Sequence, residues 1–281
     1  FLDKAAMHGF AYGAIARIPI SEGCLGNCTF CETKFARGRL RSFPEESILK
    51  AIEMSVKEGA REIELTSQDV GAYGLDRKSN IAELLEKAAE IEGNFKIRVG
   101  MLNPDLISRY FDELANAMQS DRVYKFIHLP IQSGSNKVIK DMKRKCTAEE
   151  FEEITKELRN RIKGISIETD IIVGYPSETD DDFIKTKELL EQIKPDVTNI
   201  SKFGIRPHTE SNFNKILPNE TINMRSRELS SFVKKIQQTI NSRYIGSTVE
   251  AYITEKTDIS ANGKTENYKQ VLLRQNALPG E

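Results

Sequence analysis

The sequence predicts an α/β protein: an open (βα)6 three-quarter barrel of the TIM-like kind, followed by a truncated C-terminal β module. Stretches with the two-residue alternation of strands are followed by stretches with helical periodicity, and six such units can be counted along the chain. This order predicts a parallel sheet with right-handed crossovers. Because a closed βα barrel needs eight units, six leave it open. We place the barrel at residues 1–243 and the β module at residues 244–281.

Each unit has local signals for its ends. The predicted strands cover residues 12–20, 62–66, 96–101, 123–129, 165–173 and 197–203. Helices are predicted to begin near Pro44, Ser79, Asn103 and Thr147. Gly59 fits just past the end of the first of them. Thr147 and Glu150 have the spacing of a capping box. One helix is expected to run unbroken over residues 106–118.

Composition and charge narrow the class of protein. The chain has 281 residues, 39% of them hydrophobic, and a net charge of −1. No apolar run approaches the roughly 18 residues of a membrane helix, and no leader with a cleavage site opens the chain. Four cysteines, three of them clustered, indicate a reducing cytoplasm rather than a disulfide framework. We therefore expect a cytoplasmic monomer that does not bind membranes.

Three clustered cysteines follow the first predicted strand: Cys24, Cys28 and Cys31, with Phe30 before the last. Three thiolates hold three irons of a cubane 4Fe-4S cluster and leave the fourth open, whereas clusters that only carry electrons usually have four cysteines. An open coordination position is typical of catalytic metal sites. The alternatives are a structural zinc knot or buried thiols, although no histidine follows within twenty residues. Cys146, in a charged stretch, is interpreted as incidental.

Polar residues follow several predicted strands, where the loops of βα proteins converge on one rim. Gln68 follows the second strand, and Gln132 begins the segment Gln132-Ser133-Gly134-Ser135 after the fourth. Asp170 lies on the fifth strand, before Gly174-Tyr175-Pro176. Any one of them could be a turn or cap residue. Their shared rim favours a ligand that needs several polar contacts at once.

Several segments resemble landmarks of one enzyme family. They are residues 22–31, 36–42, 128–135, 142–144 and 169–176. Over about residues 10–243, the chain resembles the methylthiotransferase branch of the radical S-adenosylmethionine (SAM) enzymes. Within that branch, Glu32-Thr33-Lys34 and Arg37-Gly38 are most similar to the archaeal and eukaryotic enzymes that act on N6-threonylcarbamoyladenosine in tRNA. Two departures are Cys146, where the family has an aromatic residue, and His208, where glycine is more usual.

The resemblance implies a transferase with a 4Fe-4S cluster on the three clustered cysteines and SAM on the open iron. The residues expected to hold SAM are Phe30, Gln68, Gln132, Arg144 and Asp170. No catalytic residue is expected beyond the cluster ligands. In this family a 5′-deoxyadenosyl radical takes hydrogen from adenine C2, sulfur is inserted, and a second SAM gives the methyl group. The resemblance also implies an electron donor and a second 4Fe-4S cluster, in an N-terminal domain that this chain is expected to lack.

A basic segment adjoins the cysteines and consists of Lys34, Arg37, Arg39 and Arg41. Clustered cations suit phosphates, which dominate nucleic-acid affinity. RNA bases are read from single-stranded loops, and an enzyme that acts on a base must expose it. We therefore expect the tRNA anticodon loop as partner.

The predicted C-terminal module resembles a truncated TRAM domain, a small RNA-binding β-barrel, in Tyr244-Ile245-Gly246 and in residues 263–269. The alternative is a β extension packed on the barrel. The preceding helix has an apolar face of Leu229, Phe232, Val233, Ile236 and Ile240. Its basic residues are Arg225, Arg227, Lys234, Lys235 and Arg243. We interpret them as a solvated face rather than an RNA contact.

Two other functions remain open from the sequence. A ribosomal-protein methylthiotransferase would share the fold and the cluster but bind a protein loop. A noncatalytic iron-sulfur RNA-binding module would hold a cluster that does not respond to SAM.

Overall fold

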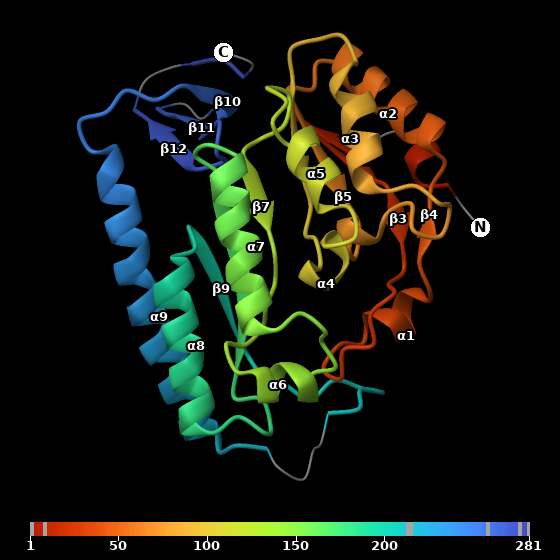
Figure 1. The fold of residues 1–281 in the computed structure, drawn as a ribbon. Helices are drawn as coiled ribbons and strands as arrows, with labels where there is room; N and C mark the ends of the chain where they lie inside the picture. The colour runs from red at the N-terminus through yellow and green to blue at the C-terminus, as the bar shows by residue number, and fades with distance from the viewer. Residues whose placement is uncertain (1–2, 8–9, 212–215, 257–258, 275–276, 280–281) are drawn as a thin grey trace.

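A computed structural model gives the fold and describes residues 3–7, 10–211, 216–256, 259–274 and 277–279. Six parallel strands form a curved wall with helices packed along it (Figure 1). The strands are β2 (Ile15–Pro19), β5 (Glu62–Thr66), β6 (Lys96–Val99), β7 (Phe126–His128), β8 (Ser166–Val173) and β9 (Val197–Lys202). The predicted open (βα)6 architecture is therefore confirmed.

The strands follow one another around the wall in sequence order. β2, β5 and β6 pair in parallel, as do β7, β8 and β9. A parallel bridge between Ile97 and Val123 joins the two sets. β1 (Phe10–Tyr12) pairs antiparallel with the other edge of β2. Within the part of the chain that the structure describes, no pairing joins β9 back to β2, so the barrel is open there.

Helices connect the strands. The longer ones are α2 (Glu45–Lys57), α3 (Ile81–Ala89), α5 (Phe111–Ala117), α7 (Ala148–Arg161), α8 (Asp180–Ile193) and α9 (Asn219–Asn241). Short elements are η1 (Ala5–Met7), β3 (Ser21–Glu22), α1 (Thr33–Arg37), β4 (Arg41–Ser42), η2 (Val70–Ala72), α4 (Pro104–Ile107), α6 (Asn136–Asp141) and η4 (Ser242–Tyr244). None of the described helices is both long and apolar enough to cross a membrane.

The predicted helix boundaries are mostly confirmed. The capping box of Thr147 and Glu150 is present, and Pro44 is the N-cap of α2. The unbroken helix over residues 106–118 was wrong, because the chain leaves the helical conformation at Tyr110, where φ is −144°. The buried Tyr110 hydroxyl donates a hydrogen bond to the carbonyl of Gly71. This contact with η2 separates α4 from α5.

The two faces of the barrel strands differ in polarity. On β5, Ile63 and Leu65 are fully buried, whereas Glu64 and Thr66 are half-buried. Successive strand residues point to opposite faces, so the apolar face meets the helices and the polar face lines the inside of the barrel, its lumen. Each fully buried Leu or Ile contributes about 1.5–3 kcal/mol of transfer free energy. The fold therefore leaves polar side chains pointing into the lumen.

A three-stranded antiparallel sheet follows α9 and consists of β10 (Ala251–Lys256), β11 (Ala261–Thr265) and β12 (Gln270–Leu273). It packs on the amino ends of the barrel strands, at the opposite end from α1 and α6 (Figure 1). The Nζ atom of Lys264 lies 2.7 Å from a carboxylate oxygen of buried Glu62. The Tyr268 hydroxyl lies 2.8 Å from the same carboxylate. The C-terminal sheet thus covers the amino end of the barrel and leaves the carboxyl end to the loops.

Candidate functional site

The cysteine loop connects β3 to α1 at the carboxyl end of the barrel. Cys24, Cys28 and Cys31 line one cavity together with Gly26. A Cβ atom on Gly26 would lie 3.3 Å from the sulfur of Cys24 and 3.7 Å from that of Cys28. The amide of Gly26 donates to the Cys24 sulfur over 3.2 Å. Glycine at this position therefore keeps the space between two sulfurs clear and directs an N–H at one of them.

The spacing of the sulfurs distinguishes between a cluster and a single ion. In the described residues, the sulfurs of the three cysteines do not all lie within 4.8 Å of one another. The ligand atoms of His128, Glu168 and Asp170 do. A zinc ion with bonds of about 2.3 Å to each sulfur would need them within about 4 Å of one another. Wider spacing and N–H donors to sulfur fit an iron-sulfur cluster. The residues present thus fit a 4Fe-4S group better than zinc.

Cys146 lies away from this cavity. It is buried, and its amide donates to the Asp105 carboxylate over 2.9 Å. It lines a different surface pocket, next to α4 and α7. It therefore offers no fourth thiolate to the three clustered cysteines.

Thr29 anchors the cysteine loop between Cys28 and Cys31. Its hydroxyl lies 2.7 Å from the Tyr175 hydroxyl, and its amide donates to the carbonyl of Met142. The hydroxyl of Ser211 donates to the Thr29 carbonyl over 2.7 Å. These partners come from the loops after β8, α6 and β9, so three loops fix the position of the cysteines.

The five residues expected to hold SAM lie at or near this end of the barrel. Phe30 packs against an apolar group of Val138, Met142, Tyr175 and Phe203. The side-chain oxygen of Gln68 accepts from the Gly23 amide over 2.7 Å. Gln132 has a left-handed φ of 77°, and its amide donates to the Asp170 carbonyl over 2.8 Å. Gln68 thus supports the cysteine loop directly, whereas Gln132 is held on β8.

Arg144 and Asp170 occupy different surroundings. Arg144 is buried, with Nη1 4.0 Å from the Cys28 sulfur and Nη2 2.7 Å from the Pro130 carbonyl. Burial raises the pKa of the Cys28 thiol, and the Arg144 guanidinium opposes that rise. Asp170 lies in the lumen, with one carboxylate oxygen 2.9 Å from His128 Nε2. The structure therefore places Arg144 beside the cysteines and Asp170 deeper in the barrel.

Sequence reasoning missed a polar chain behind Arg144. Arg144 Nη2 donates to the side-chain oxygen of Asn103 over 3.0 Å, and the Asn103 amide donates to buried Asp69 over 3.1 Å. Burial raises the pKa of Asp69 to about 6. The sequence marked Asn103 only as a helix cap, which it also is. The sequence around each of these residues gives no sign of the contact, because it forms only when the loops after three strands come together in the fold.

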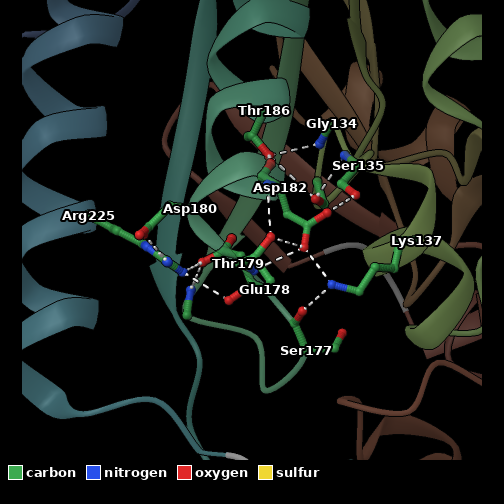
Figure 2. Close-up of polar contacts among 12 residues, drawn as sticks. Gly134, Ser135, Lys137, Ser177, Glu178, Thr179, Asp180, Asp182, Thr186 and Arg225 are labelled. Atoms are coloured by element: carbon green, nitrogen blue, oxygen red, sulfur yellow. Dashed lines mark hydrogen bonds and ion pairs between the residues drawn. The ribbon is translucent and has the colours of Figure 1, made fainter.

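The segment after Gln132 serves to hold its own loop, as the turn-and-cap interpretation allows. Ser135 donates to Asp182 over 2.6 Å, and the Gly134 amide donates to the Thr186 hydroxyl over 3.0 Å (Figure 2). Lys137 lies 2.7 Å from the same Asp182 carboxylate. A Cβ atom on Gly134 would lie 2.5 Å from the Lys185 carbonyl oxygen. This close approach to α8 requires glycine.

The prediction that Arg225 belongs to a solvated face was wrong. Arg225 is 3% exposed, and its guanidinium lies 2.6 Å from the carboxylates of Glu178 and Asp180 (Figure 2). Glu178 also accepts from the Gly174 amide over 2.8 Å. The pair therefore ties α9 to the turn that follows β8. The exposed basic residues of this helical region are Arg227, Lys234, Lys235 and Arg243.

The predicted basic segment lies on and after α1, beside the cysteine cavity. Lys34 donates to Asn27, and Arg37 forms an ion pair of 3.1 Å with Glu22. Phe35 is 62% exposed, and its ring centroid lies 6.1 Å from that of His208. His208 has φ of 61°, the left-handed conformation that glycine adopts readily. The loop after β9 thus keeps the conformation expected of glycine and brings an imidazole to Phe35.

Comparison with known proteins agrees with this arrangement. The Radical SAM superfamily matches residues 18–190, so the chain belongs to that superfamily. It is 43% identical to a probable threonylcarbamoyladenosine tRNA methylthiotransferase of Archaeoglobus fulgidus, over 97% of this chain and 66% of that protein. It is 44% identical to the Pyrococcus abyssi protein of the same name, over 91% of this chain and 60% of that protein. A Drosophila melanogaster threonylcarbamoyladenosine tRNA methylthiotransferase is 39% identical over 91% of this chain and 47% of its own length.

Solved structures support the same fold. Coproporphyrinogen III oxidase of Escherichia coli, described as a radical SAM enzyme, covers 82% of this chain and 55% of its own, with a TM-score of 0.59 and 14% identity. The radical SAM methyltransferase TsrM of Kitasatospora setae covers 70% and 38%, with a TM-score of 0.58 and 17% identity. The resemblance to methylthiotransferases is confirmed by the named relatives. The chain spans 60–66% of the two archaeal proteins.

Proposed function

We propose that this chain belongs to a transferase that adds a methylthio group to C2 of N6-threonylcarbamoyladenosine, next to the anticodon of tRNA. The observation that carries the proposal is the identity of 37–44% to archaeal proteins of that name. The site supports it through the three cysteines at the carboxyl end of the barrel. The basic segment beside them supports an RNA substrate.

The cofactors of the proposed reaction have matching residues. Cys24, Cys28 and Cys31 would hold a 4Fe-4S cluster, which supplies the reductive cleavage of SAM when bound. Arg144 places a buried positive charge beside Cys28 and so favours its thiolate. Phe30 offers an apolar surface, and Gln68 fixes the cysteine loop at Gly23. The SAM-binding roles of Phe30, Gln68, Gln132, Arg144 and Asp170 are part of the proposal.

The RNA partner is proposed on charge and exposure. Lys34 lines the cysteine cavity, and Arg37, Arg39 and Arg41, which follow it in the chain, are exposed. Exposed Phe35 adds a ring on which a base could stack, a contact worth about 1–3 kcal/mol in single-strand binding. We also propose a cytoplasmic monomer, an external electron donor and a TRAM-like role for residues 244–281. The second 4Fe-4S cluster belongs to the same proposal.

The test uses the nucleosides of cellular tRNA. Deleting the gene should remove 2-methylthio-N6-threonylcarbamoyladenosine, and its precursor without the methylthio group should accumulate in mass spectra. The intact protein should restore the product, whereas Cys24→Ala in the intact protein should not. Unchanged tRNA nucleosides together with a ribosomal protein that loses a methylthio group would instead identify the alternative substrate.

A further inference from the structure

Arg98, on β6, forms part of the closed inner end of the barrel. Its guanidinium carbon lies 5.5 Å from the ring centroid of Phe126 and 5.7 Å from that of Tyr268. Tyr268 comes from the C-terminal sheet, and its hydroxyl lies 3.3 Å from Glu64 in the lumen. Arg98 is half-buried and pairs in register with Glu64. We call Arg98, Phe126 and Tyr268 the lumen floor.

Within the described part of the chain, Arg98 differs from the cations near it in forming no ion pair with an acidic side chain. Arg17 pairs with Glu64 over 2.7 Å, and Lys264 pairs with Glu62 over 2.7 Å. In the described residues, no ion pair includes Arg98, and its buried Nε atom has no hydrogen-bond acceptor. A buried donor without a partner costs about 1–3 kcal/mol. The adjacent carboxylate of Glu64 is already engaged by Arg17 and Tyr268.

The lumen above the floor offers complementary groups. His128 and Asn199 each lie 2.9 Å from the Asp170 carboxylate, and Asn199 also donates to Glu168 over 2.7 Å. His128 and Asn199 thus partly satisfy the acids on this side. The acids can still accept hydrogen bonds from a ligand hydroxyl or N–H group. The lumen therefore combines an arginine without an anion at one side with acceptors at the other.

We infer that Arg98 binds the carboxylate of the threonyl group of the substrate, an inference that rests on the proposed function. In adenine, C2 and the N6 substituent flank N1 on one edge of the base. The N6 substituent begins only a few ångströms from C2. A base that presents C2 to the cysteine end of the barrel therefore places this substituent inside the lumen. Arginine recognises carboxylates through paired N–H donors. The threonyl hydroxyl faces Glu168, which accepts its hydrogen bond.

The experiment measures binding of three anticodon stem-loop RNAs to the full chain loaded with cluster and SAM. The RNAs carry N6-threonylcarbamoyladenosine, its threonyl methyl ester, or unmodified adenosine. The ester keeps the shape of the group but removes its charge. Because one charge-assisted contact is worth roughly tenfold or more in affinity, wild-type protein should bind the acid about tenfold more tightly than the ester.

Variants then assign the contact to one residue. Arg98→Gln should bind acid and ester equally, and Arg98→Lys should keep part of the preference. Arg122→Gln is the matched control, because its guanidinium also lies over a ring, Phe95, at 5.0 Å, but outside the lumen. It should leave the preference intact.

Two results would overturn the inference, and they differ in what else they affect. If folded Arg98→Gln keeps a tenfold preference for the acid, Arg98 does not bind the carboxylate, but the proposed substrate is still supported. Equal affinity of the wild-type protein for all three RNAs would contradict both the Arg98 contact and the proposed substrate. The ester comparison with wild-type protein also gives an answer if the glutamine variant fails to fold.

Discussion

The Tyr175 hydroxyl lies 2.7 Å from the Thr29 hydroxyl, and this contact joins the turn after β8 to the cysteine loop. Tyr175 also donates to the Asp141 carbonyl over 3.0 Å, and its ring packs edge-on against Phe203. Thr29 stands between two of the three clustered cysteines. A residue far from the cysteines in sequence therefore controls how rigidly they are held.

Tyr175→Phe should weaken that control without removing the ring. Loss of the hydroxyl contact should lower the free energy of unfolding by about 1 kcal/mol. A reconstituted cluster should form at normal iron content but bleach faster in air, because a looser loop exposes it. Decay of the iron-sulfur absorbance gives the rate. Tyr73→Phe is the control, since its buried hydroxyl contacts the Phe43 carbonyl instead. Equal decay rates in all three proteins would contradict this role for Tyr175.

Arg225→Met should be strongly destabilising. It leaves Glu178 buried without its cation, and breaking a buried ion pair costs about 3–5 kcal/mol. Arg227→Met on the same helix is exposed and should change stability by less than about 0.5 kcal/mol. Urea unfolding measures both.

Adding Glu178→Gln should restore most of the stability lost in Arg225→Met. Glutamine removes the unpaired charge, and its side-chain oxygen can still accept from the Gly174 amide. If the double variant is no more stable than Arg225→Met alone, the cost arises from lost packing rather than from the buried charge.

The contrast between Arg225 and the strands shows what the sequence could predict. The strand at residues 62–66 was predicted with its observed bounds. Such a strand can be predicted because its apolar and polar residues alternate along a short stretch of the sequence. Arg225 lies on the buried face of α9, three residues after Ile222 and four before Leu229, so helical spacing points it inward and only its charge suggested exposure. Its partner Glu178 is 47 residues away and reaches it only through tertiary packing. The same reason hid Asp69, whose contacts depend on where separate strands end.

Asp69 should make stability depend on pH in the metal-free protein. Burial raises its folded pKa from 3.8 to about 6, so the folded state binds this proton more tightly than the unfolded state. Stability from this group is fully present below about pH 4 and is lost as pH rises towards 6. Relative to wild type, the free energy of unfolding of Asp69→Asn should therefore rise by up to about 3 kcal/mol between about pH 4 and pH 6. Above pH 6 the difference between the two proteins should stay constant. Urea unfolding at several pH values tests this, and a pH-independent difference would contradict it.

The basic segment should determine how RNA binding depends on salt. Replacing Arg37, Arg39 and Arg41 with alanine should weaken tRNA binding and reduce the slope of log affinity against log salt by up to about 2, because each lost phosphate contact removes about 0.7 for single strands. The comparison variant replaces Arg227, Lys234 and Lys235, which are exposed on α9. A loss of slope in the α9 variant instead would move the RNA contact to that helix.

Iron binding should depend on the three clustered cysteines and not on Cys146. Two thiolates and a weaker ligand cannot hold a cubane cluster firmly, so Cys24→Ala, Cys28→Ala or Cys31→Ala should each lose the cluster after anaerobic reconstitution and desalting. Burial raises the pKa of the Cys146 thiol to about 12, so this side chain stays protonated and is a poor ligand. Cys146→Ala should accordingly keep the wild-type iron content and the wild-type response of the reduced electron paramagnetic resonance signal to SAM. Four irons per chain in Cys24→Ala would mean that another residue completes the site, and the assignment of the three thiolates would fail.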